Sequence, residues 1–345
     1  MIGDGAVRRV KIESASREIE VPAGQTVLEA ALAQGIAYPH GCRSGRCGSC
    51  KSRLVCGEVD LLPHTPFSLT KDEKERGLVL ACRAQPKTDV TVRWLAQEPV
   101  AYPIKTYPGT VVSNTMLTHD IIELRIAADA PMPYAPGQYA SLSLPGLPPR
   151  DYSMAPSANP SELVFHIRQV PDGRVSSQIA KLAKQGQTLS VAGPFGSAYL
   201  REDHTRPILA VAGGSGLAPI LSIVERAVAT EMNQPIHLYH GVRGLPDCYG
   251  QDEIADLVRR HRQLTYHAVL SGPPSSSGGR VGFVHEAIAQ DIGDMAGWKL
   301  YMAGPPVMVE AVGQVCLGKR LRSSDIHADV FYTPGAELGQ VSAGE

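Results

Sequence analysis

Four cysteines of the chain have a spacing that can hold a metal cluster. Cys42, Cys47 and Cys50 stand close together in GCRSGRCGSC, and Cys82 follows in LACRA. A C-x4-C-x2-C pattern with a distant fourth cysteine is the ligand spacing of plant-type [2Fe–2S] clusters, in which four thiolates hold two iron ions. The glycines and serines between the cysteines let the backbone wrap closely around a cluster and donate N–H groups to its sulfur atoms. These residues predict an iron–sulfur centre and electron-transfer chemistry.

A structural zinc site is the alternative use of the same cysteines. Zinc sites usually pair two short C-x2-C hooks, and only one such hook occurs here, so the iron–sulfur interpretation is favoured. The other cysteines, Cys56, Cys248 and Cys316, have no partners at ligand spacing. We expect them to be small buried side chains.

Basic residues accompany the cysteine loop. They are Arg43, Arg46, Lys51 and Arg53. The simpler interpretation is that they are solvated surface charges. The alternative is a basic rim that docks an acidic protein partner, and salt would then weaken the attraction. The sequence leaves both interpretations open.

A second set of polar residues has the types that hold a flavin nucleotide. Arg150, Tyr152 and Ser153 lie in the strand-like segment RDYSMA. An aromatic ring beside a hydroxyl can stack on a flavin and reach its N5 atom, and an arginine can pair with a phosphate. Gly173 precedes a helical segment whose first turn includes Ser176, and the free N–H groups of a helix start favour a pyrophosphate. Taken in order and at this spacing, the residues predict a flavin site.

Two glycine turns follow apolar strands in the last part of the chain. Gly213, Gly214, Ser215 and Gly216 lead from the strand PILAVAG into a helix, and AGPPVM at residues 303–308 follows the last apolar strand. Glycines at the carboxyl end of a parallel strand let the backbone approach a phosphate or a nicotinamide. The first turn is not a GxGxxG fingerprint, so two ordinary turns of an α/β domain are the simpler alternative. We expect the turns to lie side by side in a doubly wound sheet.

The elements that must position these residues form three domains. Residues 1–97 combine alternating strand-like segments with a helical stretch that ends at Gly35, which predicts a small α+β domain. Residues 98–108 contain three prolines without periodicity and indicate a linker. Residues 109–203 are β-rich, with one helix near 176–185, and predict an antiparallel barrel or sandwich. Residues 204–345 alternate strand and helix, as βαβ units around a parallel sheet do.

Composition excludes several other classes of protein. The 345 residues carry a formal net charge of −1, which argues against a general nucleic-acid binder. The N-terminus has no apolar run after its basic residues, and no stretch reaches the ~18 apolar residues of a membrane span. We therefore expect a cytoplasmic protein without membrane partners, and a cofactor rather than disulfides as the use of the cysteines.

The three sets of residues together resemble the ferredoxin–NADP reductase superfamily, and within it the reductase components of ring-hydroxylating dioxygenases such as naphthalene dioxygenase reductase. The resemblance covers nearly the whole chain. It implies a β-grasp-like [2Fe–2S] ferredoxin domain at 1–97, an antiparallel β-barrel for FAD at 109–203, and an α/β parallel-sheet NAD(P)H-binding domain at 204–345. It also implies FAD as the flavin.

The resemblance assigns roles to individual residues. The FAD contacts that it implies are Arg150, Tyr152, Ser153, His166, Arg168, Gly173, Arg174, Val175 and Ser176, with His166 and Arg168 on the adenylate side. The residues that it implies for the nicotinamide nucleotide are Gly214, Ser215, Gly216, Pro219, Gly304 and Pro305. It places Phe331, in HADVFY, near the flavin ring. Ser153, beside N5, is the residue expected to matter most for the rate.

The chain departs from the family pattern in places. Many members have a cysteine before the second glycine turn, where this chain has Ala303, and a tail extends past Phe331. NADPH-using relatives have a serine–arginine pair where this strand ends in LSGPP. NADH is the expected donor, and Arg243, after the preceding strand, leaves NADPH open as a second donor.

The expected activity is electron transfer from NADH through FAD and the cluster to a partner, with the protein holding nicotinamide, flavin and cluster in place. The partner implied by the resemblance is a terminal Rieske-type oxygenase or an intermediary ferredoxin, and a monomer is expected. A reductase for a diiron or flavin hydroxylase, or for a sugar deoxygenation enzyme, stays open. So does a cluster-based redox sensor without turnover, although the intact flavin and nicotinamide motifs oppose it.

Overall fold

The computed structural model describes residues 7–95, 102–170, 175–272 and 280–331. The chain divides into two compact units. One comprises Met1–Glu98 with the segments Pro305–Glu310 and Val330–Glu345, and the other comprises Pro99–Gly304 with Ala311–Asp329. Among the described residues, no helix is long and apolar enough to cross a membrane.

The first unit is a small sheet covered by a helix. Its elements are β1 (Arg8–Ile12), η1 (Glu13–Ala15), β2 (Arg17–Val21), α1 (Val27–Ala33), β3 (Lys51–Cys56), β4 (Val59–Leu61), α2 (Lys71–Glu75), β5 (Leu78–Leu80), β6 (Ala84–Pro86) and β7 (Val90–Trp94). Five strands form a sheet in the order β2-β1-β7-β3-β5, with β1 antiparallel to β2 and parallel to β7. Alternate residues such as Val10 and Ile12 are buried, and α1 begins at a capping box of Thr26 and Glu29. The predicted α+β domain is confirmed.

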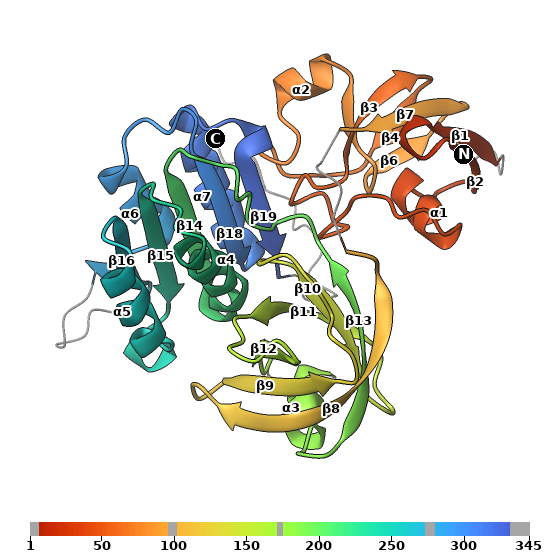
Figure 1. Cartoon of the computed structure of the whole chain (residues 1–345). Helices are drawn as coiled ribbons and strands as arrows, with labels where there is room; N and C mark the ends of the chain where they lie inside the picture. The colour runs from red at the N-terminus through yellow and green to blue at the C-terminus, as the bar shows by residue number, and fades with distance from the viewer. Residues whose placement is uncertain (1–6, 96–101, 171–174, 273–279, 332–345) are drawn as a thin grey trace. The chain divides into compact units, whose positions relative to one another are not determined.

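The next part is a closed antiparallel barrel, drawn in yellow and green in Figure 1. Its elements are β8 (Lys105–Met116), β9 (Ile121–Ala128), β10 (Tyr139–Ser143), β11 (Arg150–Ala155), β12 (Glu162–Arg168), α3 (Ser176–Leu182) and β13 (Thr188–Phe195). The strand order is β10-β11-β12-β9-β8-β13, and the pairs are antiparallel. Leu124, Ile126, Phe165 and Val191 are fully buried inside it. Closure decides between the barrel and the sandwich that the sequence allowed.

The last part is a six-stranded sheet with helices, drawn from green to blue in Figure 1. Its elements are β14 (Ile208–Gly213), η2 (Gly214–Gly216), α4 (Leu217–Ala229), β15 (Ile236–Val242), η3 (Leu245–Asp247), α5 (Gln251–Arg260), β16 (Leu264–Leu270), β17 (Arg280–Val281), α6 (Val284–Asp291), β18 (Lys299–Gly304), α7 (Pro306–Gly318), η4 (Ser323–Asp325) and β19 (Ile326–Val330). The order is β17-β16-β15-β14-β18-β19, and β14 is parallel to both β15 and β18. Since Ala212 lies opposite Ala303, the carboxyl ends of β14 and β18 meet, as the sequence predicted.

Some details differ from the sequence expectations. The helix expected near 176–185 ends at Leu182, and β8 begins at Lys105, inside the range assigned to a linker. Cys56 is exposed at the end of β3 and Cys248 is partly exposed, so of the three cysteines expected to be buried only Cys316 is. The expectation for Cys56 was wrong because it rested on cysteine spacing alone. Spacing does not show that Cys56 is the last residue of β3, where the strand is exposed to solvent.

Candidate functional site

The structure brings the four predicted cluster ligands together in the first unit. The Cys42 N–H group donates to Cys47 Sγ over 3.4 Å, and the Cys82 N–H group donates to Cys50 Sγ over 3.4 Å. Cys47, Cys50 and Cys82 are buried, whereas Cys42 is partly exposed. Three of the four cysteines are therefore shielded from water, and the more exposed side of the ligand set is at Cys42.

Backbone donors surround these sulfur atoms, as thiolate ligands require. The N–H groups of Ser44 and Arg46 donate to Cys42 Sγ over 3.5 and 3.2 Å. Hydrogen bonding, from Cys47 first, lowers the pKa of the Cys42 thiol to about 5 against the opposing effect of burial. The side-chain hydrogen bond with Cys42, together with burial, raises the pKa of the Cys47 thiol well above its ordinary value, so Cys47 holds its proton. Metal binding would have to displace that proton.

The loop can follow this path only with glycines at particular positions. Gly45 and Gly48 have φ angles of +74° and +77°, in the left-handed region. A Cβ atom at Gly41 would lie 3.2 Å from Cys47 Sγ. Two pairs of neighbouring cysteines, backbone donors and a tight glycine loop fit a [2Fe–2S] cluster at the predicted ligands Cys42, Cys47, Cys50 and Cys82.

The flavin motif lies on β11, in the second unit. Ser153 is 7% exposed, and its Oγ donates to Asp329 Oδ2 over 2.5 Å. Burial raises the pKa of Tyr152 to about 12, so its phenol stays protonated. Ser222 Oγ on α4 donates to the carbonyl of Met154 over 2.8 Å and ties β11 to the parallel-sheet part. Arg150 Nη1 donates to the Pro149 carbonyl.

Asp329 was not found from the sequence. It stands two residues before Phe331 in HADVFY, on β19, and the acidic residue beside the expected aromatic was the available signal. Phe331 directly follows β19 and is partly buried.

The two β12 residues of the flavin set face different neighbours. His166 Nδ1 lies 3.2 Å from the Tyr249 hydroxyl, and burial lowers the pKa of His166 to about 4, so the ring is neutral. Arg168 Nε donates to Asp120 Oδ2 over 2.7 Å. A Cβ atom at Gly214 would lie 3.0 Å from Arg168 Nη1, so this guanidinium lies against the first glycine turn.

The start of α3 is described only in part. Val175 is the residue before α3 and is buried, and Ser176 Oγ accepts a hydrogen bond from the Val170 N–H group over 3.1 Å. Gly173 and Arg174 lie outside the described residues. Two of the four residues expected at the pyrophosphate are thus placed at the first turn of the predicted helix.

The first glycine turn is packed too tightly for larger residues. Gly214 has a φ of +55°, and a Cβ atom at Gly216 would lie 2.1 Å from the Ala303 carbonyl oxygen at the end of β18. Ser215 and Pro219 are buried in the turn and the first turn of α4, and Gly304 and Pro305 follow the neighbouring strand. His240 Nε2 lies 3.3 Å from the Gly214 carbonyl, and burial lowers the pKa of His240 to about 4. A neutral His240 can therefore donate to that carbonyl and fix the turn.

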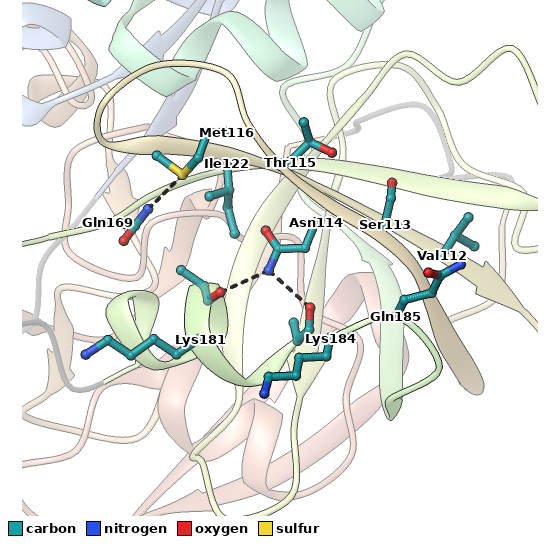
Figure 2. A pocket seen from close by; sticks show the side chains of 12 residues that line it. Val112, Ser113, Asn114, Thr115, Met116, Ile122, Gln169, Lys181, Lys184 and Gln185 are labelled. Atoms are coloured by element: carbon teal, nitrogen blue, oxygen red, sulfur yellow. Dashed lines mark hydrogen bonds between the residues drawn. The ribbon is translucent and has the colours of Figure 1, made fainter.

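A hollow of about 620 Å³ lies elsewhere on the barrel (Figure 2). It is bordered by the end of β8 and by α3, where Asn114 Nδ2 donates to the carbonyls of Ala180 and Ala183 over 3.1 Å. None of the residues predicted to hold a cofactor lines it. We do not assign it to the redox site.

A cluster of three possible metal ligands also lies apart from the cysteines. His119, Asp120 and Asp247 are close enough to one another to share an ion. Asp120 is already paired with Arg168, and Asp247 Oδ2 accepts from the Gly244 N–H group over 2.9 Å. These contacts account for both carboxylates without a metal.

The fold and the site define a flavin- and iron–sulfur-dependent NAD(P)H oxidoreductase. Three family models match in chain order. They are a 2Fe-2S iron-sulfur cluster binding domain at residues 10–87, an oxidoreductase FAD-binding domain at 108–199 and an oxidoreductase NAD-binding domain at 210–314.

Known relatives cover almost the whole chain. The chain is 38% identical to the reductase component of the naphthalene 1,2-dioxygenase system of Pseudomonas putida, over 94% of this chain and 98% of the relative. It is 34% identical to the reductase component of phenol 2-monooxygenase of Pseudomonas sp., over 96% and 97%. The chain belongs to the ferredoxin–NADP reductase superfamily, among the reductase components of ring-hydroxylating dioxygenases.

Solved structures share the fold. The structure of the Amycolatopsis cytochrome P450 reductase GcoB matches with a TM-score of 0.72 and 32% identity, over 94% of this chain and 98% of that one. The ferredoxin reductase in carbazole 1,9a-dioxygenase matches with a TM-score of 0.68 and 30% identity, over 95% and 99%.

Proposed function

We propose that the chain passes electrons from NADH, through FAD and its [2Fe–2S] cluster, to the oxygenase of a ring-hydroxylating system or to that system's Rieske-type ferredoxin. The relatives named as dioxygenase and monooxygenase reductases support an oxygenase as the destination. The observation that carries the proposal is the convergence of the flavin strand and the first glycine turn in one unit. Ser153 and Arg168, from neighbouring barrel strands, reach Asp329 and Gly214 of the parallel-sheet part.

We assign the residues of the flavin site as follows. Bound FAD would accept a hydride and give up electrons singly. The residues that would hold it are Arg150, Tyr152, Ser153, His166, Gly173, Arg174, Val175 and Ser176, with Phe331 near the ring. Ser153 is the positioned hydroxyl, because its hydrogen bond to Asp329 fixes the rotamer of the side chain.

The dinucleotide is assigned to the neighbouring turns. The residues that would receive it are Gly214, Ser215, Gly216, Pro219, Gly304 and Pro305. Arg168 joins this set as well as the flavin set, because its guanidinium lies against Gly214, where a phosphate of the dinucleotide could be paired. Asp120 holds that guanidinium in place.

NADH is the proposed donor. Arg280, the first residue of β17, is engaged by Asp291 and Gln290 and is not available for a 2′-phosphate. Arg243 is exposed after β15, and its carbonyl accepts from the Gly272 N–H group over 2.8 Å. This single exposed guanidinium supports some use of NADPH, with NADH preferred.

The domain boundaries stay part of the proposal. We assign residues 1–97 to the ferredoxin domain, 109–203 to the FAD barrel and 204–345 to the NAD(P)H domain. The linker is assigned to residues 98–108, and the first barrel strand, β8, already starts within it at Lys105. We place the reaction in the cytoplasm, which suits a chain whose seven cysteines form no disulfide.

An anaerobic visible spectrum tests the proposal. NADH added to the purified protein should bleach flavin and iron–sulfur bands, and NADPH in a parallel sample should do so more slowly. If neither NADH nor NADPH bleaches the absorption bands after reconstitution with FAD, iron and sulfide, the proposed function is overturned and a redox sensor is favoured.

A second candidate function differs only in the acceptor. The relatives named as phenol and propane monooxygenase reductases, at 30–34% identity, favour a hydroxylase in place of a dioxygenase. Copurification of the tagged chain from its host, followed by identification of the bound oxygenase, separates the two.

A further inference from the structure

The part of the first unit that carries the cysteines has a one-sided charge. Every cluster ligand lies in one of two segments, residues 36–57 and 78–87, and the loop 61–70 packs against them. None of these three segments contains an Asp or a Glu; Glu58 and Asp60 lie between the first segment and the loop, and Asp60 pairs with Lys87. Residues 7–95 as a whole hold fourteen Lys and Arg against ten Asp and Glu. The acidic residues of the domain are therefore confined to other segments.

Two arginines at the cysteine loop keep their charge unneutralised. Lys51 Nζ, by contrast, donates to Glu73 Oε1 over 2.6 Å, and both side chains are buried. Arg43 is exposed, and its Nη2 lies 3.2 Å from His40 Nε2. Within the described part of the chain, no carboxylate forms an ion pair with Arg43 or Arg83. These two guanidinium groups can therefore attract an external anion.

Both arginines flank the exposed side of the ligand set. Arg43 directly follows Cys42, the one ligand that is partly exposed. A Cβ atom at Gly45 would lie 2.8 Å from Arg83 Cγ and 3.0 Å from His64 Cβ, so these side chains lie across the loop between Cys42 and Cys47. A partner that reaches the exposed side of the ligand set at Cys42 would touch this surface.

The surroundings of His64 agree with a positive local field. Burial lowers the pKa of His64, and the charges of Lys74 and Arg83 lower it further. A cluster held by four thiolates is itself anionic, so an acidic partner needs positive charge close to the point of contact.

We propose that the surface made by Arg43, His64 and Arg83, here named the basic cluster face, docks the electron acceptor, and that the acceptor presents a patch of Asp and Glu. The assignment rests on the proposed function, because it names the surface through which the electrons leave. One electron moves from the reduced cluster to a one-electron acceptor, and no bond forms or breaks.

Two other uses of the same arginines are outcomes of the test. They could only tune the potential of the cluster, since nearby charge sets it. They could instead bind the rest of this chain, which carries nineteen basic against twenty-four acidic residues. Each use changes a different measurable quantity.

The test uses the full-length protein loaded with FAD and iron–sulfur cluster. The variant Arg43→Glu/Arg83→Glu is compared with Arg17→Glu, an exposed residue on β2 at the opposite edge of the sheet from β5. Acidic cytochrome b5 and basic cytochrome c serve as probe acceptors. For each protein we would measure b5 binding to the oxidised enzyme, reduction of both cytochromes by NADH, bleaching by NADH without acceptor, and the midpoint potential of the cluster. Arg43→Gln/Arg83→Gln replaces the double reversal if iron loading fails.

At low ionic strength, the Arg43→Glu/Arg83→Glu variant should bind cytochrome b5 at least ~tenfold more weakly than the wild type. The rate of b5 reduction, divided by the rate of bleaching by NADH, should fall by at least the same factor. The loss should shrink as salt is added, cytochrome c should respond in the opposite direction, and Arg17→Glu should change b5 binding less than ~twofold.

Unchanged b5 binding with a shifted midpoint potential would overturn the proposal in favour of tuning. Unchanged b5 binding with slower bleaching would assign the face to the chain's own flavin part. If the wild-type protein fails to bleach with NADH, the proposed function fails, whereas b5 binding still tests the surface because it needs no turnover.

Discussion

Ser153 Oγ on the barrel strand β11 donates a 2.5 Å hydrogen bond to Asp329 Oδ2 on β19, the edge strand of the parallel sheet. The two residues are 176 positions apart in the chain. The hydroxyl expected beside the flavin is thus oriented by a carboxylate from the part expected to bind NADH. The site depends on the barrel and the sheet together.

Replacing Ser153 should slow flavin reduction by NADH. We expect Ser153→Ala to lower the anaerobic stopped-flow rate by about ten- to a hundredfold, because a preorganised contact in a water-poor site is lost. Ser222→Ala is the matched control: it removes another serine hydrogen bond to β11 and should lower thermal stability while keeping the rate per bound flavin. An unchanged rate in Ser153→Ala would remove the assigned role.

The Ser153 and Asp329 contributions should not add. Since the side chains bond to each other, Asp329→Ala should already release the serine rotamer, and the double variant should be little slower than the slower single variant. A double-mutant cycle on the stopped-flow rates measures the coupling. Additive free energies would show that the two side chains act separately.

The first glycine turn should not tolerate a methyl group. Gly216→Ala would place Cβ 2.1 Å from the Ala303 carbonyl, and we expect a loss of about 2–4 kcal/mol in the free energy of unfolding together with weaker NADH binding. Gly293→Ala is the control, because a Cβ atom at Gly293 would have nothing within 4 Å. Chemical denaturation and NADH titration of both variants check the expectation; equal stabilities would contradict it.

The second unit should lose stability in mild acid. Burial lowers the pKa of both His166 and His240 from 6.5 to about 4. Between these values the unfolded chain binds protons that the folded chain excludes, so the free energy of unfolding falls as pH falls, by at most about 3 kcal/mol per histidine. The window closes near pH 4, where the folded form also protonates.

One tryptophan reports on that unit. The chain has two, and Trp94→Phe leaves Trp298, which stacks on His237. In this background, denaturation followed by fluorescence should give a shallower pH dependence for His240→Asn than for the parent. The same slope in both proteins would show that His240 is not protonated on unfolding.

The iron content of cysteine variants should distinguish the proposed cluster ligands from the exposed Cys56. Cys82→Ser removes one of the four proposed ligand sulfur atoms and should abolish the iron–sulfur absorption and most bound iron. Cys56→Ser changes an exposed residue at the end of β3 and should keep both. Full iron in Cys82→Ser, or loss of iron in Cys56→Ser, would overturn the ligand assignment.

The sequence predicted what depends on local spacing. The four cysteines proposed as cluster ligands could be selected because three of them lie within nine residues and thiolates have few other uses at that spacing. The neighbouring positions of the two glycine turns could be predicted because strands that alternate with helices can form a parallel sheet in only a few strand orders. Contacts between distant segments could not be predicted. Asp329 beside Ser153 and Arg168 beside Gly214 each depend on how the barrel meets the sheet, which no local pattern encodes.

Closure of the barrel also bears on how the protein avoids self-association. In the described part of the barrel each of the six strands has a neighbour on both sides, so no row of free N–H and C=O groups is offered to another chain. Strand edges belong to the open sheets, among them the five-stranded and the six-stranded sheet. There β17 is only two residues long, and β2 carries Arg17, Glu18 and Glu20, which oppose pairing with a second copy. At these strands, edge-to-edge pairing of two folded copies is therefore opposed by short length and by charge.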